Sequence, residues 1–481
     1  MDLLDGDDSV HPNHCSNYEF TDLGNAAYFV DRVQDRVRFD TGRNRWLVWH
    51  QHRWEPDKTL QVEKEAQRIA QERTKEAAAM PRGDDVQIDR RERTLRWALI
   101  SEGLWKIEAS LRLAKPQLAV STASGWDADP WLLGVPNGVV DLRTGVLRDG
   151  HRDDRITKHA GVPFDPFATC PRWERFLEEI LGDPSVVAFQ RKALGYTLTG
   201  NVKEDCWFGC HGTGRNGKST QFKALIAVFG DYGYTAGFSL VERGRGESRR
   251  DFDIAYLQNT RFVMASETRD GTTWDEERLK KLTGGDPLHA EIKFGAEFDF
   301  LPSHKLWFMF NHQPRARDHS IGFWRRVRLI PFARQFSDAD GTVDKHLESK
   351  LQAEYMGILA WLVRGCLEWQ REGLTVPQVI LDATAQYERD EDPLNGFTQK
   401  YIAPAKGERF SLKDAFALYQ QWCRDEHITS QLGRTRFGTL LDAKFKRYNL
   451  NGSAWYRDAR LGCNCVFLPG CPHRKSSTGA P

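Results

Sequence analysis

The stretch "GCHGTGRNGKST", residues 209–220, decides the fold of the chain around it. From Gly212 to Ser219 it matches the phosphate-binding loop pattern, in which four residues separate two glycines and a lysine and a hydroxyl follow. Glycines let the backbone curl until successive N–H groups point at an anion. The apolar run "CWFG" precedes the loop, and an amphipathic helix predicted over 217–229 follows it. Strand, glycine loop and helix in this order predict a site for the phosphates of a nucleoside triphosphate.

Each residue type of the loop has a chemical role. Lys218 can reach the β- and γ-phosphates, and the Ser219 hydroxyl can ligate Mg²⁺. The positive N-terminal end of the following helix adds to the attraction. ATP and Mg²⁺ are therefore the expected cofactors. The residues expected to contact ATP are Gly212, Thr213, Gly214, Arg215, Asn216, Gly217, Lys218, Ser219 and Thr220.

Two later apolar runs each end in a polar residue. "RFVMASE" ends at Glu267, where a carboxylate is placed to orient the attacking water and to help hold Mg²⁺. The usual acidic pair is absent because Ser266 comes before it, so either Glu267 serves both roles or Mg²⁺ is held mainly through Ser219 and water. "KLWFMFN" ends at Asn311, whose amide could hydrogen-bond the γ-phosphate or the water.

A pair of arginines stands just before another apolar run. In "GFWRRVRLIPF", Arg325 and Arg326 precede the predicted strand. An isolated arginine is usually a surface charge, but a pair at this point suits a finger that a subunit inserts into its neighbour's ATP site. The four expected catalytic positions are Lys218, Glu267, Asn311 and Arg326, with Arg325 as the second choice for the finger.

Short apolar runs between residues 170 and 336, each followed by a loop or helix pattern, predict a buried, mostly parallel sheet and an α/β fold. In the C-terminal part, two helices and a hairpin around an Asn-Gly turn follow in the order of a winged helix. The expected segments are a mixed, mostly helical N-terminal region (1–165), the ATPase core (166–340), a helical extension (341–375) and a winged-helix-like domain with a disordered tail (376–481).

Composition limits the surface charge and the cellular location that can be expected of the protein. The net charge is +1, so any basic surface must be local. Nine cysteines, an odd number in a long chain, favour reduced thiols, and no apolar run is long enough for a bilayer. We therefore expect no membrane association and a cytoplasmic protein; the resemblance described next implies a bacterial or phage-infected cell. Zinc binding by the C-terminal cysteines is disfavoured, because Cys463 and Cys465 lie two apart and the spacing is not that of a zinc finger.

The motifs together resemble a known family. "GTGRNGKST", "RFVMASETRDGTTWDEERLKKLTGGD", "FLPSHKLWFMFNHQP" and "FWRRVRLIPF" follow one another as in superfamily 3 helicases, and most resemble the phage and plasmid primase–helicase group, which includes the poxvirus type. The resemblance is dense over about 200–335 and extends upstream through "PNGVVDLRTG" and "CPRWERFLEEILGD". It implies an AAA+-type P-loop core in a hexameric ring that moves 3′ to 5′ on single-stranded DNA, with ATP sites between subunits. By position, Lys218 and Ser219 resemble the first motif, Glu267 the catalytic acid, Asn311 the sensor and Arg326 the finger.

The family also carries a DNA-binding hairpin before the sensor strand. Here "LHAEIKFGAEFDFLP" alternates apolar and polar residues, turns near Gly295 and continues as a second strand. Lys293 near the tip could hold one phosphate of the strand, a contact independent of sequence. A solvated hairpin lysine is the alternative.

Two functions remain open from the sequence. The first is a DNA helicase that acts at replication forks of a phage, prophage or plasmid, with a separate primase or polymerase as possible partner. The first region is short for a primase domain and has no clear pair of metal-binding carboxylates, so no priming activity is expected. The second is an ATP-switched ring that loads or recruits other replication or defence proteins without unwinding. A small-molecule kinase is disfavoured because it would have no role for the arginine pair or the hairpin.

Overall fold

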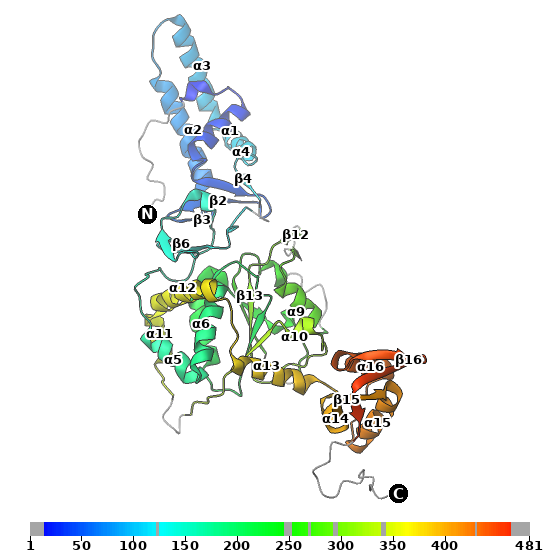
Figure 1. The fold of residues 1–481 in the computed structure, drawn as a ribbon. Helices are drawn as coiled ribbons and strands as arrows, with labels where there is room; N and C mark the ends of the chain where they lie inside the picture. The colour runs from blue at the N-terminus through cyan, green and yellow to red at the C-terminus, as the bar shows by residue number, and fades with distance from the viewer. Residues whose placement is uncertain are drawn as a thin grey trace, which may run out of the picture.

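The computed structural model contains three bodies that follow one another along the chain: a helical N-terminal region, a central α/β body and a small C-terminal body (Figure 1). The residues that it describes are 14–121, 125–244, 253–267, 271–291, 297–337, 343–428 and 431–462.

The N-terminal region is mostly helical, as predicted. Helix α1 begins after Thr21, whose side chain accepts a hydrogen bond from the Gly24 N–H. Strands β2 and β3 form an antiparallel hairpin in a sheet of order β3-β2-β1-β4. Trp54 is buried, so this hairpin serves as core. The elements are α1 (Asp22–Val33), β1 (Val37–Asp40), β2 (Arg45–His50), β3 (Arg53–Pro56), α2 (Gln61–Ala79), α3 (Asp85–Ser101), α4 (Leu104–Ala114) and β4 (Ala119–Val120).

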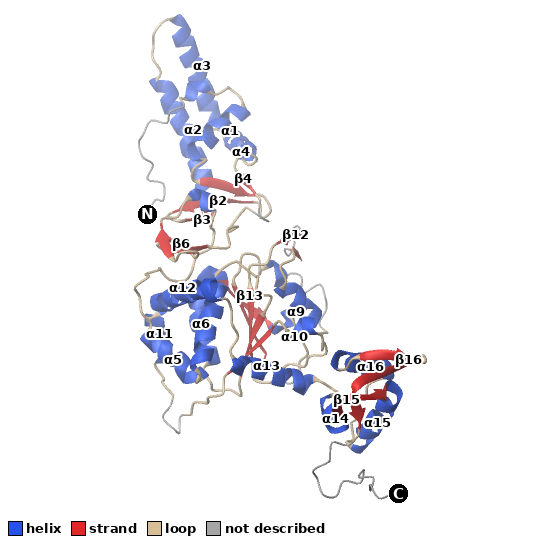
Figure 2. Ribbon diagram, viewed as in Figure 1, coloured by secondary structure: helices blue, strands red, loops and turns tan. Residues whose placement is uncertain are grey.

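The central body is built on a five-stranded sheet, and the prediction of a parallel sheet is confirmed. All neighbours pair in parallel in the order β14-β8-β13-β10-β9. Successive residues of a strand point to opposite faces, so Phe208 packs on one face and Trp207 on the other. Helices cover both faces (Figure 2). The strands are β8 (Trp207–His211), β9 (Gly233–Gly237), β10 (Phe262–Glu267), β13 (Lys305–Phe310) and β14 (Val327–Pro331).

Two of the covering helices, α6 and α12, meet backbone to backbone at glycines. A Cβ on Gly195 of α6 would lie 2.1 Å from the backbone nitrogen of Cys366, and a Cβ on Gly365 of α12 would lie 2.3 Å from the carbonyl oxygen of Arg191. Only glycine, which has no Cβ, permits the two helices to approach this closely. The helices around the sheet are α5 (Pro171–Leu181), α6 (Pro184–Leu198), α7 (Lys218–Phe229), α9 (Glu276–Thr283), α10 (Ile321–Trp324), α11 (Leu347–Ala353) and α12 (Tyr355–Glu372).

A small antiparallel sheet, β5-β6-β7, precedes the central body in sequence but packs with it. Val140 and Phe164 lie in the same hydrophobic cluster as Phe208 of the central sheet, and so does Trp361 of α12. The predicted segment boundaries at 165 and 340 therefore fall inside one continuous hydrophobic core. Apolar residues on both sides of each boundary pack together, although their sequence patterns differ. The three strands, which sequence patterns did not predict, are β5 (Leu132–Val135), β6 (Gly138–Asp141) and β7 (Val146–Arg148).

The hairpin expected near residue 295 is present in its two arms. Strand β11 (Leu288–Glu291) pairs antiparallel with β12 (Glu297–Phe300), with Leu288 opposite Phe300. Lys293, proposed for its tip, lies outside the described residues.

The C-terminal body follows helix α13 (Gln378–Glu391), whose Tyr387 packs into the central body and accepts a hydrogen bond from Trp274 Nε1 at 2.8 Å. Asn451 and Gly452 both have positive φ and turn the expected hairpin. Strand β15, which the sequence did not predict, adds a third strand in the order β15-β17-β16. The elements are α14 (Asn395–Tyr401), β15 (Ile402–Ser411), α15 (Leu412–Asp425), α16 (Arg434–Lys444), β16 (Arg447–Leu450) and β17 (Ser453–Leu461).

The C-terminal cysteines and the expected disordered tail lie outside the described residues. Within the described part of the chain, no helix is both long enough and apolar enough to cross a bilayer. The cysteines in that part are free and buried: Cys15, Cys170, Cys206, Cys210, Cys366 and Cys423.

Candidate functional site

The glycine loop lies at the carboxyl end of β8, between the end of that strand and the start of α7. Gly214 has φ +103° and Gly217 has φ +80°, and Arg215 between them is also left-handed at φ +49°. Gly212 is needed for a different reason: a Cβ there would lie 2.5 Å from the carbonyl oxygen of Phe332. The glycines thus allow both the curl of the loop and its close approach to a neighbouring segment.

That neighbouring segment, residues 332–336, continues from β14 and is called the loop brace here. The Phe332 N–H donates to the His211 carbonyl at 2.7 Å, and the Phe336 N–H donates to the Arg215 carbonyl at 2.8 Å. The brace therefore holds the backbone of the loop at its beginning and at its middle.

Side chains strengthen the same contact. Gln335 Nε2 donates to the Thr213 hydroxyl at 2.6 Å, and the buried Asn216 amide donates to the Phe332 carbonyl at 3.4 Å. Thr213 and Asn216, both expected to contact ATP, are thus bound to the brace in this structure.

Lys218 is the first residue of α7 and its side chain is held inside the loop. Its Nζ donates to the Gly212 carbonyl at 2.6 Å and to Asn311 Oδ1 at 3.1 Å. The residue is only 6% exposed. Burial lowers the pKa of Lys218 from 10.5 to about 8, and the nearby Cys210 thiol opposes that shift. Two of the predicted catalytic residues, Lys218 and Asn311, are therefore in direct contact.

Ser219 and Thr220 follow in the first turn of α7. Ser219 is exposed and Thr220 is partly exposed, so both hydroxyls can be reached by a ligand. Gly217 provides no side-chain cap for the helix, and the first N–H groups of a helix have no partner within it. An exposed hydroxyl beside free N–H donors fits a phosphate with its Mg²⁺.

Glu267 is brought to the same edge of the sheet by strand register. His211 of β8 lies opposite Phe310 of β13, and Phe310 lies opposite Glu267 of β10. Asn311 follows Phe310 directly. Adjacent strands lie about 4.8 Å apart, so the glycine loop, Asn311 and the backbone of Glu267 come together at the carboxyl edge of neighbouring strands.

The arginine pair lies at the other end of the sheet. The Trp207 N–H, at the beginning of β8, donates to the Arg326 carbonyl at 2.9 Å. Strand β8 has five residues, which separate this point from the loop by about 16 Å. Arg326 is mostly buried and donates to the Gly322 carbonyl at 2.6 Å, while Arg325 is half-exposed and 3.5 Å from Asp205. Neither arginine joins the loop of its own chain.

A pocket of about 450 Å³ adjoins the loop, and sequence patterns gave no sign of it. Loop and helix residues form one wall, and α5 and the segment after the brace form the others. Apolar Phe176, Phe336 and Leu347 supply a surface that a flat ring could contact. The pocket is lined by Arg172, Phe176, Glu179, Arg215, Gly217, Thr220, Phe336, Val343, Asp344, Lys345, Leu347 and Glu348.

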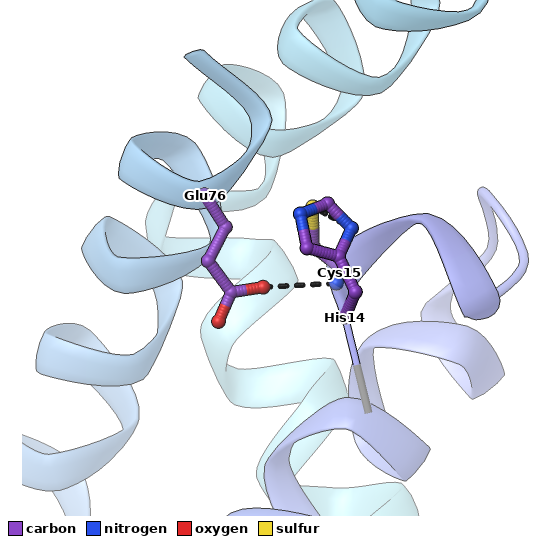
Figure 3. A group of neighbouring side chains, drawn as sticks. All are labelled: His14, Cys15 and Glu76. Atoms are coloured by element: carbon purple, nitrogen blue, oxygen red, sulfur yellow. Dashed lines mark hydrogen bonds between the residues drawn. The ribbon is translucent and has the colours of Figure 1, made fainter. Parts of the chain in front are cut away.

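A second cluster of polar side chains lies in the N-terminal region, where His14, Cys15 and Glu76 meet (Figure 3). Glu76 accepts from the Cys15 N–H at 2.8 Å and forms an ion pair with Arg32 at 2.7 Å. Burial raises the pKa of the Cys15 thiol to about 11. A carboxylate already neutralised by a guanidinium and a protonated thiol form a structural contact that attaches the start of the chain to α2.

Comparison with known proteins agrees with these motifs. Residues 26–182 match the family described as D5 N terminal like, and residues 210–326 match a family of unknown function (DUF5906). A putative helicase of Acanthamoeba polyphaga mimivirus is 25% identical over 348 residues, which cover 68% of this chain and 36% of that protein. Through its N-terminal match and these relatives, the chain is similar to proteins of the primase–helicase type. It is also similar to a putative helicase of Frog virus 3, 23% identical over 69% of this chain and 42% of the relative.

Other relatives are named primases. A putative primase of African swine fever virus is 22% identical over 70% of this chain and 38% of the relative. The chain thus spans well under half the length of the curated relatives that it matches. Among solved structures, the C-terminal region of NrS-1 resembles it with a TM-score of 0.51 at 10% identity, over 90% of this chain and 98% of that chain, which shows a common fold.

Proposed function

We propose that the chain is an ATP-dependent DNA helicase motor. The observation that carries the proposal is the strand register that places the glycine loop, buried Lys218, Asn311 and the end of β10 at one edge of the sheet. Ligands of open α/β sheets bind at the carboxyl ends of the strands, where the strand order reverses, and β8 lies at such a point. The names of the relatives, helicase and primase, support nucleic acid as the partner.

ATP would bind with its phosphates in the loop and its base in the adjoining pocket. Lys218 Nζ would exchange the Gly212 carbonyl for the β- and γ-phosphates, which frees Asn311 to bind the γ-phosphate or the attacking water. Ser219 and Glu267 would hold Mg²⁺, which neutralises the charge that develops on the phosphates. Apolar Phe176 and Phe336 would pack on the base. The AAA+-type P-loop assignment of the core is part of this proposal.

Each complete site needs a second subunit. Arg326 and Arg325 lie about one strand length from the loop of their own chain, so they can serve as fingers only in a neighbouring site. A ring of subunits, expected to be a hexamer moving 3′ to 5′ on single-stranded DNA, provides that arrangement. The hairpin β11–β12 with Lys293 would contact the strand in the channel, and the C-terminal body would act as a winged-helix-like accessory domain. The setting would be replication of a phage, prophage or plasmid.

The second candidate function is an ATP-switched ring that loads or recruits another protein. The arrangement of the three bodies favours this second function, because the N-terminal and C-terminal bodies lie outside the central α/β body, where partner proteins could bind them (Figure 1).

One experiment separates the two candidates. ATP hydrolysis is measured with and without single-stranded DNA, strand displacement is measured on a forked duplex, and native mass measurement gives the number of subunits. A helicase should show DNA-stimulated hydrolysis and unwinding, and Lys218→Ala should abolish both because it removes the cation from the phosphates. Slow hydrolysis without unwinding would favour the loading ring. Full turnover by Lys218→Ala would refute the phosphate-loop assignment.

A further inference from the structure

The structure contains a second large pocket, at the opposite edge of the central sheet from the glycine loop. Its volume is about 720 Å³, within the range of small-molecule sites. Arg261 comes directly before β10 and Ser303 lies just before β13, so the pocket opens at the amino ends of these strands. The six residues of β10 separate it from the proposed ATP site by about 20 Å.

The pocket adjoins the hairpin and the entry to the small sheet. Phe300 ends β12, Leu301 follows it, and Trp126 comes from the segment before β5. Leu301 is 67% exposed, while Trp126 is buried. Figure 1 shows β12 at the end of the central body that faces the N-terminal region. The walls are largely apolar, through these side chains and through Pro130, Pro287 and Pro302.

Buried basic side chains lie at and beneath the pocket. Arg261, which lines it, is fully enclosed and donates to the carbonyls of Leu198 and Leu132, each at 2.6 Å. Lys305, whose backbone N–H donates to the Arg261 carbonyl at 2.8 Å, is also buried, and its Nζ donates to the Thr199 and Ser303 carbonyls. Among the described residues, no carboxylate forms an ion pair with either side chain. Burial, with the charge of Arg261 close by, lowers the pKa of Lys305 well below its usual range. The lowered pKa favours the neutral form of Lys305, so the buried positive charge at this end of the sheet is that of Arg261, on which Asp127 and Asp129 act from beyond ion-pair distance. An anion in the pocket would be attracted to this guanidinium.

The two carboxylates that line the pocket, Asp127 and Asp299, have hydrogen-bond partners outside it. Asp127 accepts from the Thr157 N–H at 2.8 Å and from the Thr157 hydroxyl at 2.5 Å. Asp299 lies on the exposed arm of the hairpin and interacts with His289 at 3.0 Å. On the rim, exposed Lys203 supplies a cation that a ligand can reach directly.

We propose that this pocket binds a nucleotide unit, with its phosphate attracted by Lys203 and the buried Arg261 and its base against the apolar wall of Trp126, Phe300 and Leu301. Aromatic and apolar surfaces bind bases of any sequence, and basic groups hold the backbone phosphates. The nucleotide can belong to a nucleic-acid strand or be free, and the test below distinguishes the two. The site is separate from the proposed ATP site and does not depend on hydrolysis there.

Gly285 offers a way to fill the pocket with little disturbance. It lines the pocket, and a Cβ on it would meet only Val202, another lining residue, at 4.0 Å. Gly285→Leu should therefore occupy the space that the base needs. Gly433→Leu is the matched control, because a Cβ on Gly433 has no atom within 4 Å and the residue lies at the start of α16, away from the pocket. Lys203→Ala is an independent test should Gly285→Leu fail to fold.

Binding of a short fluorescein-labelled oligothymidylate to the full chain is followed by fluorescence anisotropy, and binding of thymidine monophosphate by calorimetry. Gly285→Leu and Lys203→Ala should each weaken binding about tenfold, and Gly433→Leu should not. Weakened binding of the oligonucleotide alone identifies a strand as the source, whereas weakened binding of the monophosphate identifies a free nucleotide. Binding of both probes that is insensitive to Gly285→Leu and Lys203→Ala, or equally sensitive to Gly433→Leu, overturns the proposal.

Lys218→Ala separates this proposal from the proposed function. That variant should lose ATP hydrolysis but bind the oligonucleotide as the unchanged protein does, because its substitution lies at the other edge of the sheet. ATP hydrolysis thus tests the proposed function and oligonucleotide binding tests the pocket, so that either proposal can fail while the other holds.

Discussion

Lys218 is a buried amine whose partners in this structure are a carbonyl and an amide oxygen, with no carboxylate among them. Its pKa of about 8 lies below the unfolded value of 10.5, so the unfolded chain binds more protons between these values. The contribution of this group to stability therefore rises with pH from about 8 to about 10.5.

Nucleotide binding should reverse that shift, because phosphates favour the charged amine. We expect ATP binding to take up a proton above pH 8 and to weaken as pH rises through that value. Calorimetry at pH 7 and pH 9, in two buffers of different ionisation enthalpy, measures the uptake. Lys218→Met should abolish the difference between the two pH values. Proton uptake that persists in Lys218→Met would assign it to another group.

Asn311 supplies the second prediction at this scale. Asn311→Ala removes the amide that contacts Lys218 and that is proposed to bind the γ-phosphate or the water. We expect ATP affinity to change little and turnover to fall by about 10², the usual loss for one oriented polar group. Steady-state hydrolysis combined with nucleotide binding measures both quantities. A large loss of affinity with unchanged turnover would instead make Asn311 a structural partner of Lys218.

Much of the proposed site could be predicted residue by residue. Lys218, Ser219 and Asn311 follow strands or loops whose type the sequence shows, and parallel strands end at one edge of a sheet. The brace could not be predicted. The contact of Gln335 with Thr213 joins positions far apart in the chain, and no periodicity or spacing encodes it. Whether Arg326 faces its own loop or the opposite edge also depends on the three-dimensional course of β14.

At the scale of elements, the crossing of α6 and α12 makes a stability prediction. Gly195→Ala would place a methyl group 2.1 Å from the backbone nitrogen of Cys366, so the helices must move apart. We expect a loss of about 2 kcal/mol or more in the free energy of unfolding of the central body. Urea denaturation followed by circular dichroism measures it.

Gly438→Ala in α16 is the matched control for that substitution. Its Cβ would meet only the flexible side chain of Leu412, at 3.3 Å, and alanine favours helix more than glycine does. Equal losses in the two variants would show that helical glycines in general, and not this crossing, determine the effect.

Elements with strong local patterns were predictable, and those without them were not. Four of the parallel strands, β8, β10, β13 and β14, lie in apolar runs, whereas β9, "GYTAG", does not. Asn451–Gly452 forms a turn that its residue types specify. Strand β15 was missed because "IAPAKGERFS" contains a proline, a glycine and several charges, and its pairing with β17 is interrupted between Pro404 and Arg409. The small sheet β5-β6-β7 was missed because its strands have only three or four residues each.

At the scale of the whole molecule, the position of Arg326 predicts complementation between subunits. Arg326→Ala should bind ATP nearly normally, because Lys218, Ser219 and the loop belong to the same chain. Hydrolysis should fall by about 10³. A mixture of Arg326→Ala and Lys218→Ala proteins should regain activity, since some interfaces then combine an intact loop with an intact finger.

Arg325→Ala provides the comparison for this test, because Arg325 is the more exposed member of the pair. It should have a smaller effect on hydrolysis than Arg326→Ala. A fully active monomer of the unchanged protein, shown by native mass measurement with an ATPase assay, would refute a site shared between chains.

The β14 strand connects two places that the proposed ring would use at different times. Its amino end follows the arginine pair, and its carboxyl end runs into residues 332–336, which grip the loop of the same chain. In a ring, the two ends of β14 would thus lie at two neighbouring catalytic sites. When the neighbour's ATP is cleaved, a displacement of Arg326 would be transmitted along β14 to Phe332. It would weaken the contacts between residues 332–336 and the glycine loop that holds the chain's own phosphates. The order in which the subunits hydrolyse ATP would then be determined by this one strand.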